Sequence, residues 1–380
     1  MFAACAPPYY CGGGKQAMNL AMMLAAHGHK VTFITSNLDG ETAAYEHIQG
    51  VDVHRLDMGG EARVQSLWFL FGAIKHLIRH RKAIDVAHFP SGAFWHVVPI
   101  LLLACMLGKP TILKLTALGV DDLKSIHQRR FGMLFLWTLR RVSRIVAITD
   151  EFRQLGLEMS FPTQQIALIP NGVNIKMYQA DDTSRDSVRE ALQIPLDVCL
   201  VLFVGGMYAN KGVDTLLDAW ERTQVQCPEA MLLLVGPMPL EGSPDSMLVA
   251  RIMKLREDGG RIRMLSIQDD INRYYQSADI FTLPSRSEGL PNVTLEAMSS
   301  KLPVVVSDIG GHRAIVTQEH DGLVVPVSDS EALAESLTRL INDAELREKL
   351  GEQARKTVLS KFALEIVAQQ YGRLYKEVSR

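Results

Sequence analysis

The sequence predicts an α/β protein with two doubly wound domains, each built on a parallel sheet flanked by helices. Short, fully apolar runs such as KVTFIT (30–35), LVLFV (200–204) and LPVVVS (302–307) recur along the chain, with helical segments between them. Parallel sheets that are covered on both faces have continuous apolar strands of this kind. The chain of 380 residues is also too long for one ordinary core and fits two domains of about 150–200 residues.

The composition is that of a globular protein whose charge is unevenly distributed. Apolar residues make up 47%, charged residues 22%, and the net charge is −2. Residues 1–180 carry 18 Lys and Arg against 12 Asp and Glu, a net +6, whereas residues 181–380 carry 22 against 30, a net −8. Two halves of opposite charge suggest that the domains meet different partners.

The cysteines and the apolar runs bear on the compartment. The five cysteines are scattered, odd in number and never form CxxC, which argues against a zinc site and a disulfide framework and favours a reducing compartment. No basic segment of a signal peptide precedes the first apolar residues. The longest apolar run, 97–107, is shorter than the about 20 residues that span a bilayer. We therefore expect a cytoplasmic protein, soluble or bound peripherally at the inner face of the membrane.

Strand-like and helical segments alternate through the first half of the chain, as a parallel doubly wound sheet requires. The expected strands lie at 2–6, 30–35, 85–89, 111–115 and 144–148. The expected helices lie at 15–27, 64–82 and 129–144. His88 is expected to end its strand, at the edge where open α/β sheets bind ligands, so it is a candidate base or sugar contact as well as a candidate buried imidazole.

Glycines 12–14 precede the first expected helix, in a place where backbone N–H groups can hold a phosphate. A Walker P-loop would need Gly at Tyr9 and Ser or Thr at Gln16, so that motif is excluded. A dinucleotide fingerprint is disfavoured because the second strand ends in Asn37 and not in an acidic residue. A tight strand–helix turn remains the structural alternative for these glycines.

The expected helices at 64–82 and 129–144 combine aromatic and basic residues. Trp68 and Phe71 precede four basic residues in the first, and Trp137 lies among five arginines in the second. Such helices can lie on anionic membrane surfaces, and they can equally be core-facing stripes with solvated basic rims. Peripheral membrane contact is therefore a hypothesis for the first domain.

The second half repeats the alternation after a polar stretch, 179–189, that we interpret as a linker. Its expected strands lie at 200–204, 231–235, 263–265, 280–284 and 302–307, followed by helical segments at 331–355 and 363–380. A glycine turn, Gly205-Gly206, follows the first strand, and Lys211 precedes the next helix. Asp279 is expected to brace the start of a strand.

The segment 285–308, SRSEGLPNVTLEAMSSKLPVVVSD, carries the most specific signal. It predicts a turn after a strand, then a helix at 293–300 capped by Asn292, then a buried strand. The N-terminus of that helix suits a phosphate. Glu288 and Glu296 would repel a phosphate but accept hydrogen bonds from hydroxyls, so sugar hydroxyls beside a diphosphate would explain both. Two surface glutamates near a helix start are the simpler alternative.

This motif, Glu288-x7-Glu296 followed by Gly310-Gly311, resembles the retaining glycosyltransferases of family GT4, which have the GT-B fold of two Rossmann-like domains. The resemblance covers nearly the whole chain. It implies that Glu288 contacts the donor hexose and Glu296 the ribose. The donor-binding residues that it implies are Gly13, Gly14, Gly205, Gly206, Lys211, Glu288, Gly289, Leu290, Pro291, Asn292, Val293 and Glu296.

The same resemblance implies domain limits and exposes two departures. An acceptor-side domain at 1–175, joined by the last helix at 363–380, would face a donor-binding domain at 176–362. Thr116 stands where many members carry His, and Gly206 stands where Arg often helps Lys211 to grip the diphosphate. His312 is expected in a loop.

The implied activity is transfer of a hexose from a UDP- or GDP-linked donor to a hydroxyl of a lipid-linked or polysaccharide acceptor, with retention, in an envelope, exopolysaccharide or lipopolysaccharide pathway. Glu288, Lys211 and His88 are the candidate catalytic residues. Lys211 and the Asn292 helix would stabilise the leaving diphosphate, so no metal or other cofactor is expected. Asp121-Asp122 and Asp269-Asp270 are adjacent pairs and not a DxD motif.

Two alternatives to transfer remain. A nucleotide-sugar-binding regulatory or catalytically weak protein would be consistent with the departures at Thr116 and Gly206. A GT-B sugar-nucleotide epimerase would act without an acceptor. A nucleic-acid partner is not expected, because the basic residues are scattered.

Overall fold

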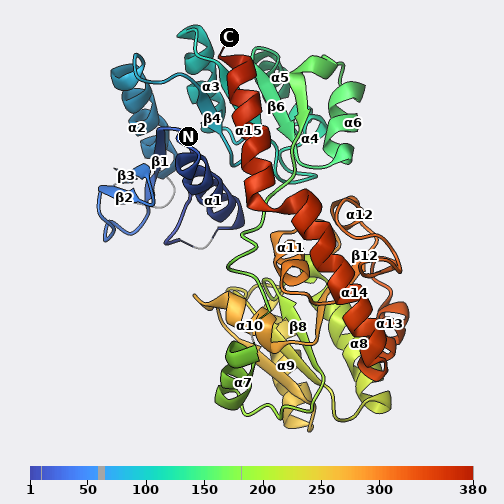
Figure 1. The fold of residues 1–380 in the computed structure, drawn as a ribbon. Helices are drawn as coiled ribbons and strands as arrows, with labels where there is room; N and C mark the ends of the chain where they lie inside the picture. The colour runs from blue at the N-terminus through green and yellow to red at the C-terminus, as the bar shows by residue number, and fades with distance from the viewer. Residues whose placement is uncertain (10, 59–64, 181, 380) are drawn as a thin grey trace. The chain divides into compact units, whose positions relative to one another are not determined.

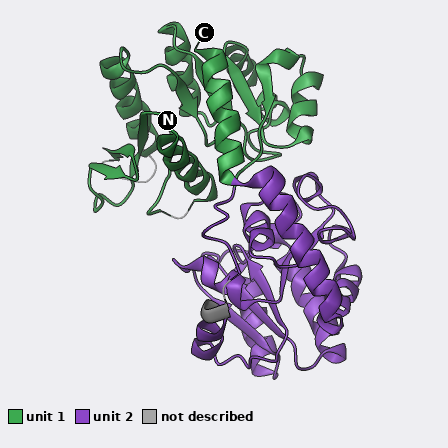
Figure 2. Ribbon diagram, viewed as in Figure 1, with its two compact units in different colours: residues 1–172, 364–380 green, residues 173–363 purple. Residues whose placement is uncertain are grey.

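The computed structural model describes residues 1–9, 11–58, 65–180 and 182–379. Residues 1–172 and 364–380 form one compact unit, unit 1, and residues 173–363 form a second, unit 2 (Figures 1 and 2). The first junction lies three residues before the expected limit and the second lies one residue after it. Both units are α/β with parallel sheets, as the sequence predicts.

Unit 1 contains a three-stranded sheet in the order β1-β3-β2 and a four-stranded sheet in the order β4-β5-β6-β7. Neighbouring strands are parallel except for the antiparallel pair β2 and β3. The strands are β1 (Val31–Asn37), β2 (Tyr45–Ile48), β3 (Val51–Asp57), β4 (Ala87–Phe89), β5 (Thr111–Lys114), β6 (Arg144–Ala147) and β7 (Ile166–Leu168).

The expected first strand, at 2–6, is reduced to a single bridge. Phe2 pairs with Ile34 of β1, and its N–H donates to the carbonyl of His88 in β4 at 2.9 Å. The segment therefore joins the edges of the two sheets, where the first strand of a doubly wound sheet would lie. The prediction was correct in position and wrong in extent.

Helices cover these sheets, and the last helix of the chain returns to unit 1. They are α1 (Gly12–Ala26), α2 (Gln65–His80), α3 (Val97–Met106), α4 (Leu123–His127), α5 (Gly132–Leu139), α6 (Asp150–Glu158), the short η1 (Thr163–Gln165) and α15 (Leu364–Val378). The returning helix α15 packs along α1 and buries Tyr371 and Leu374 in their shared core (Figure 1).

Two helix predictions need correction, and the start of a third is not tested. The glycines that were expected to precede the first helix lie inside α1. The helix expected at 129–144 is only α5, because a turn closed by the hydrogen bond from the Gly132 N–H to the Arg129 carbonyl precedes it. Val64, the expected start of the helix at 64–82, lies outside the described residues.

Unit 2 has one six-stranded sheet in the order β10-β9-β8-β11-β12-β13, with all neighbours parallel. The strands are β8 (Leu200–Val204), β9 (Met231–Val235), β10 (Ile262–Leu265), β11 (Ile280–Leu283), β12 (Val304–Ser307) and β13 (Leu323–Val325). Every residue of β8, β9, β11 and β12 is buried, which explains their continuous apolar sequences.

The helices of unit 2 lie on both sides of its sheet. They are α7 (Asp182–Ala191), η2 (Ala209–Lys211), α8 (Val213–Gln226), α9 (Ser246–Glu257), α10 (Ile271–Ser277), α11 (Asn292–Ser299), α12 (Gly310–Arg313), α13 (Ser330–Asn342), α14 (Ala344–Thr357) and the π-turn η3 (Val358–Phe362). Among the described residues, no helix combines the length and the apolar character that crossing a membrane requires.

The polar stretch 179–189 is not the expected linker, because α7 occupies most of it. Arg189, in α7, is fully buried and donates to Asp279 at 2.6 Å, and Arg185 donates to the same carboxylate at 2.7 Å. Asp279 also accepts from the N–H of Leu200 at 2.7 Å. The expectation that Asp279 braces the start of a strand is confirmed, and the same carboxylate ties α7 to the sheet through Arg185 and Arg189.

Candidate functional site

The strand order of unit 2 reverses between β8 and β11. From β8 the chain moves outward through β9 to β10, and it then returns to β11 on the other side of β8. In open α/β sheets, ligands bind outside the carboxyl ends of the strands at such a reversal. The loops that leave these two strands, at 205–211 and 284–289, contain several of the predicted donor residues.

Lys211 and Glu288 meet at this point. The Lys211 Nζ donates to the Glu288 Oε1 at 2.7 Å, and the Ser285 Oγ donates to the same oxygen at 2.8 Å. The side chains of Lys211 and Glu288 are 28% and 13% exposed, so the pair is accessible without being fully solvated. Since both donors bind Oε1, Oε2 is the oxygen oriented to accept a further hydrogen bond.

Close backbone contact fixes the two loops against each other. Gly212, directly after Lys211, has φ +71°, and a Cβ at this position would collide with the Pro284 carbonyl. Both conditions require glycine. Arg286 connects the two loops a second time. Its guanidinium pairs with Asp214 at 2.6 Å, and its backbone N–H donates to the Asn210 carbonyl at 2.9 Å. Lys211 and Glu288 are therefore held by contacts within unit 2.

Gly205 and Gly206 form the turn that follows β8. A side chain at Gly206 would collide with the ring of Tyr208, which fills the adjoining space. An arginine at this position would require that ring to move. Lys211 is therefore the cation that the loop after β8 brings to Glu288.

Residues 289–291 form the turn between Glu288 and α11. Asn292 is the first residue of α11 and not its cap, so the capping prediction was wrong. Pro291 occupies the cap position in an extended conformation and has no side-chain acceptor. The predicted residues Gly289, Leu290 and Val293 belong to this same turn and first helical turn, where the backbone N–H groups of a helix are not used within the helix.

Glu296 lies deeper than Glu288. Its side chain is buried in α11 and accepts a hydrogen bond from the Tyr275 hydroxyl at 2.9 Å. The Tyr178 hydroxyl also bonds to Glu296, and burial together with this carboxylate raises the pKa of Tyr178. A carboxylate can accept about four hydrogen bonds, so a ribose hydroxyl could share it with the tyrosines.

The short helix α12 packs beneath the Glu288 turn. A Cβ on Gly311 would lie 2.9 Å from the Glu288 carbonyl and 2.8 Å from the Gly289 carbonyl, so only glycine permits this approach. His312, which was expected in a loop, lies in α12 and is fully buried. Burial lowers the pKa of His312 to about 4, although Glu288 acts in the opposite direction.

In unit 1, Gly13 and Gly14 form the first turn of α1. Cys11 occupies the N-cap position and makes no side-chain hydrogen bond to the helix, and the neighbouring Cys5 thiol lowers the pKa of Cys11. A Cβ on Gly14 would collide with the Cys5 carbonyl and the Cys11 sulfur. Both glycines line a hollow of about 330 Å³, together with Ser91, Gly92, Phe94, His96 and Thr116.

Thr116 anchors the loop that it starts. Its N–H and its hydroxyl donate to the Asp121 carboxylate at 3.0 and 2.9 Å, and the N–H of Ala117 donates to the same group at 2.6 Å. Asp121 is fully buried, and burial raises its pKa in spite of these bonds. In the sequence, Asp121 was noted only as half of an adjacent acidic pair, and no local signal indicated this role.

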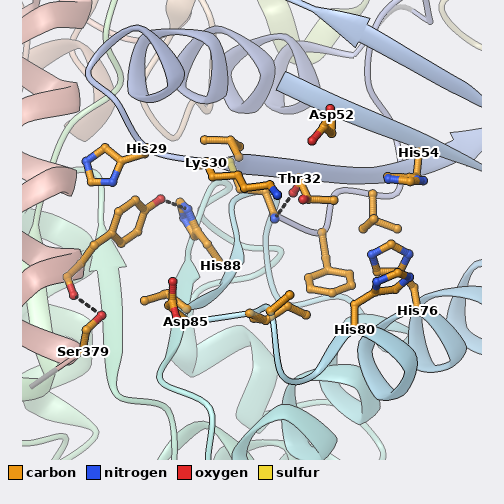
Figure 3. A pocket seen from close by; sticks show the side chains of 18 of the residues that line it. His29, Lys30, Thr32, Asp52, His54, His76, His80, Asp85, His88 and Ser379 are labelled. Atoms are coloured by element: carbon orange, nitrogen blue, oxygen red, sulfur yellow. Dashed lines mark hydrogen bonds between the residues drawn. The ribbon is translucent and has the colours of Figure 1, made fainter. Parts of the chain in front are cut away.

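His88 is the second-to-last residue of its strand, as in the predicted strand at 85–89, and its catalytic role stays a prediction. It lies in the middle of β4, is buried, and its Nδ1 is 2.7 Å from the Tyr375 hydroxyl. It lines a pocket of about 530 Å³, together with residues that include Lys30, Asp52 and Asp85 (Figure 3). These residues precede or begin strands, so this pocket is at the amino ends of the strands. His88 is a buried imidazole bonded to α15.

Comparison with known proteins places this site in a family. A model described as "Glycosyl transferase 4-like domain" matches residues 12–172, within unit 1, and one described as "Glycosyl transferases group 1" matches residues 184–357, within unit 2. Two doubly wound units, each matched by a glycosyltransferase model, fit the GT-B fold. The chain belongs to the GT4-like glycosyltransferases.

Curated relatives cover either the whole chain or part of it. The chain is 26% identical to the uncharacterized glycosyltransferase MJ1607 of Methanocaldococcus jannaschii, over 97% of this chain and 95% of that protein. It is 29% identical to the lipopolysaccharide core biosynthesis mannosyltransferase LpcC of Rhizobium leguminosarum bv. viciae, over 67% and 70%. It is 27% identical to the putative teichuronic acid biosynthesis glycosyltransferase TuaC of Bacillus subtilis, over 58% of this chain and 52% of that protein.

Solved structures share the fold. HepE of Anabaena, solved in complex with UDP-glucose, has a TM-score of 0.77 and 17% identity, and the match covers 99% of this chain and 98% of that one. At this identity the likeness shows the fold alone. The fold and the family together establish a glycosyltransferase that uses a nucleotide sugar.

Proposed function

We propose that this protein transfers a hexose from a UDP- or GDP-linked donor to a hydroxyl of a lipid-linked or polysaccharide acceptor, with retention of anomeric configuration. The observation that carries the proposal is the Lys211–Glu288 pair at the strand reversal, 2.7 Å apart and partly exposed. A cation and a carboxylate side by side match the two ends of a sugar diphosphate, one anionic and one rich in hydroxyls.

The diphosphate is assigned to Lys211 and the N-terminus of α11. Lys211 would form charge-assisted hydrogen bonds with phosphate oxygens, and the positive end of the helix dipole adds to the same potential. In the free protein the Lys211 ammonium is neutralised by Glu288. Donor binding then adds phosphate oxygens as partners of Lys211 and directs the Glu288 Oε2 to a hexose hydroxyl.

In this mechanism the bond from the anomeric carbon to the diphosphate breaks, and the bond to the acceptor oxygen forms on the same face of the sugar. The acceptor proton passes to the leaving phosphate oxygen, so the reaction balances without a protein base. This agrees with Thr116, which cannot titrate near neutral pH and is bonded to Asp121. Positive potential at the leaving group is the main catalytic contribution that we assign to the protein.

We also propose that transfer needs no added metal. Lys211 and the N-terminus of α11 supply positive potential that stabilises the negative charge on the leaving group, as a bound cation would. A chelator tests this directly, because activity that depends on a divalent cation is lost when the cation is removed.

The acceptor class is proposed from the relatives and from the surface of unit 1. LpcC and TuaC are named for lipopolysaccharide and teichuronic acid synthesis, and HepE was solved with UDP-glucose. These names support a cell-surface glycan or its lipid-linked precursor as acceptor and a UDP-linked hexose as one donor candidate.

We also propose a peripheral membrane contact through neighbouring helices of unit 1. The helix α3 contacts both α2 and α5 (Figure 1). The three helices expose large apolar side chains, namely Leu67, Trp68, Phe71, Ile78, Met106, Met133, Leu134 and Trp137. Residues 65–149 hold 12 Lys and Arg against 3 Asp and Glu, and two of these acids, Asp121 and Asp122, are buried. Apolar side chains within a basic region fit an anionic lipid surface.

Flotation with vesicles tests the membrane contact. We expect the protein to float with vesicles that contain anionic lipid, less at high salt, and not with neutral vesicles. Trp137→Ser with Met133→Ser should weaken binding, whereas Val225→Ser, which changes an exposed apolar side chain of unit 2, should not. Equal flotation with neutral vesicles, or none with either, would contradict the proposal.

Thermal stabilisation by UDP-glucose, UDP-galactose, UDP-GlcNAc, GDP-mannose and ADP-glucose, with NAD as control, tests the donor. A ligand that binds only the folded protein raises the melting temperature. A shift with one nucleotide sugar would identify the donor, and transfer would then be measured with glycan and lipid-linked acceptors. Stabilisation without release of nucleotide would favour a binding protein, and a shift with NAD alone would overturn the proposal.

A further inference from the structure

A series of hydrogen bonds leads from the buried His312 to the catalytic carboxylate. The His312 Nδ1 is 2.9 Å from the Ser307 carbonyl oxygen, at the end of β12. The Ser307 hydroxyl donates to the Ser285 carbonyl, which lies just beyond the neighbouring strand β11. The Ser285 hydroxyl in turn donates to the Glu288 Oε1 at 2.8 Å. His312, Ser307 and Ser285 are all fully buried, so water does not compete for these bonds.

The chemistry of the first bond fixes the tautomer of His312. A carbonyl oxygen only accepts hydrogen bonds, so the Nδ1 must carry the proton that it donates to Ser307. The Nε2 then carries the lone pair, and it has no hydrogen-bond partner among the described residues. His312 therefore acts on the site through Nδ1–H.

The backbone of α12 supports the same turn from a second side. Gly311 approaches the carbonyls of Glu288 and Gly289 so closely that a Cβ would lie within 2.9 Å of both. A side chain that keeps α12 in place therefore also keeps the Glu288 backbone in place. The hydrogen-bond series therefore holds the side chain of Glu288, and the Gly311 contact holds its backbone.

We propose that His312 is a positioning residue for the donor sugar, which orients Glu288 through Ser307 and Ser285. The inference rests on the proposed function of Glu288 and adds to it the residues that hold this carboxylate. His312 touches neither sugar nor phosphate in this assignment. Its Nδ1–H fixes the carbonyl end of β12, Ser307 transmits that position to the Ser285 backbone, and Ser285 sets the Glu288 rotamer.

Four variants separate positioning from folding. His312→Leu removes the Nδ1–H, and His312→Asn keeps a side-chain N–H near the same place. Ser307→Ala interrupts the series and leaves His312 intact. Thr282→Val is the matched control, because the Thr282 hydroxyl makes a similar buried bond between the same two strands, to the Val305 carbonyl at 3.0 Å, but does not lead to Glu288.

The readouts are kcat/KM for the identified donor and the affinities for nucleotide sugar and for nucleoside diphosphate alone. His312→Leu and Ser307→Ala should each lower kcat/KM by about 3- to 10-fold, which is the effect of one neutral hydrogen bond. They should weaken nucleotide-sugar binding more than nucleoside diphosphate binding, because the sugar is assigned to Glu288 directly and the diphosphate is linked to it only through Lys211. His312→Asn and Thr282→Val should retain wild-type kcat/KM.

A double-variant test completes the experiment. Ser285→Ala together with His312→Leu should lower kcat/KM no further than Ser285→Ala alone, because both changes break one series. Losses that multiply, or equal weakening of diphosphate and sugar binding, would mean that His312 only stabilises the fold and would overturn the inference. A wild-type protein that neither transfers nor hydrolyses any nucleotide sugar would refute the proposed function itself, and the inference with it.

Discussion

Glu288→Gln is the substitution that separates the catalytic role of the Lys211–Glu288 pair from its structural role. Glutamine has nearly the shape of glutamate, so the contacts of the turn with Gly311 and Gly212 remain. The negative charge of the carboxylate, to whose Oε1 both Lys211 and Ser285 donate hydrogen bonds, is lost. The substitution should therefore change the free energy of unfolding and kcat/KM by different amounts.

The stability effect should be small. The Lys211 side chain is 28% exposed, so water can solvate its ammonium once the charge of Glu288 is lost, and the cost should stay near that of an exposed pair, about 1 kcal/mol. The catalytic effect should be larger, because a hydrogen bond to a charged group is worth about 1.5–3 kcal/mol. If that bond is made to the donor sugar in the transition state, kcat/KM falls about 10- to 150-fold. Glu288→Ala, which also removes the geometry, should abolish transfer.

Release of nucleotide from the stabilising donor, followed by chromatography, measures kcat/KM, and urea unfolding measures stability. The matched control is Glu319→Gln, because Glu319 also pairs with a cation in unit 2, Arg339, but both side chains are about half exposed. The control should leave kcat/KM unchanged. Wild-type activity in Glu288→Gln, or a loss of activity explained entirely by unfolding, would refute the reasoning.

Three further results are expected. Asp279→Ala should lower the free energy of unfolding by about 3–5 kcal/mol in urea titrations, because it leaves the fully buried Arg189 without its carboxylate; a change below 1 kcal/mol would contradict this. His312 has a pKa of about 4 in the folded protein, so the unfolded chain takes up a proton first as pH falls below its ordinary value of about 6.5. Stability should therefore fall by about 2 kcal/mol between pH 7 and pH 5, and this part of the fall should be absent in His312→Asn. EDTA should leave the transfer rate unchanged, and restoration of a lost rate by Mg²⁺ or Mn²⁺ would disprove metal independence.

The sequence alone determined the fold class and predicted the loops of unit 2 in which we propose the donor site. Continuous apolar strands can only be buried on both faces, so LVLFV and LPVVVS required helices on each side of a parallel sheet. The spacing from Glu288 to Glu296 and the glycines before Lys211 are local features of turns and helix starts. They were singled out because they resemble the motif of GT4 enzymes, which needs no tertiary information, whereas the predicted Asn292 cap was wrong.

Local patterns also misled in identifiable cases. Polarity predicted a linker at 179–189, but the buried Arg189 pairs with Asp279, which lies ninety residues away in the sequence. The apolar run around His88 predicted a place near the end of a strand, where ligands bind. Only α15, which returns from the end of the chain, shows that the hydrogen-bond partner of His88 is Tyr375. No local rule reports a partner so distant in the sequence.

The tertiary structure alone decided which residues support the site. Ser285, Ser307 and His312 have no distinctive spacing, and each becomes significant only because β11 and β12 are neighbours and α12 packs against the Glu288 turn. The pairing of Lys211 with Glu288 likewise depends on the strand order that puts β8 beside β11. Sequence periodicity records which residues are buried along one element, whereas hydrogen bonds between elements depend on how the sheet is ordered.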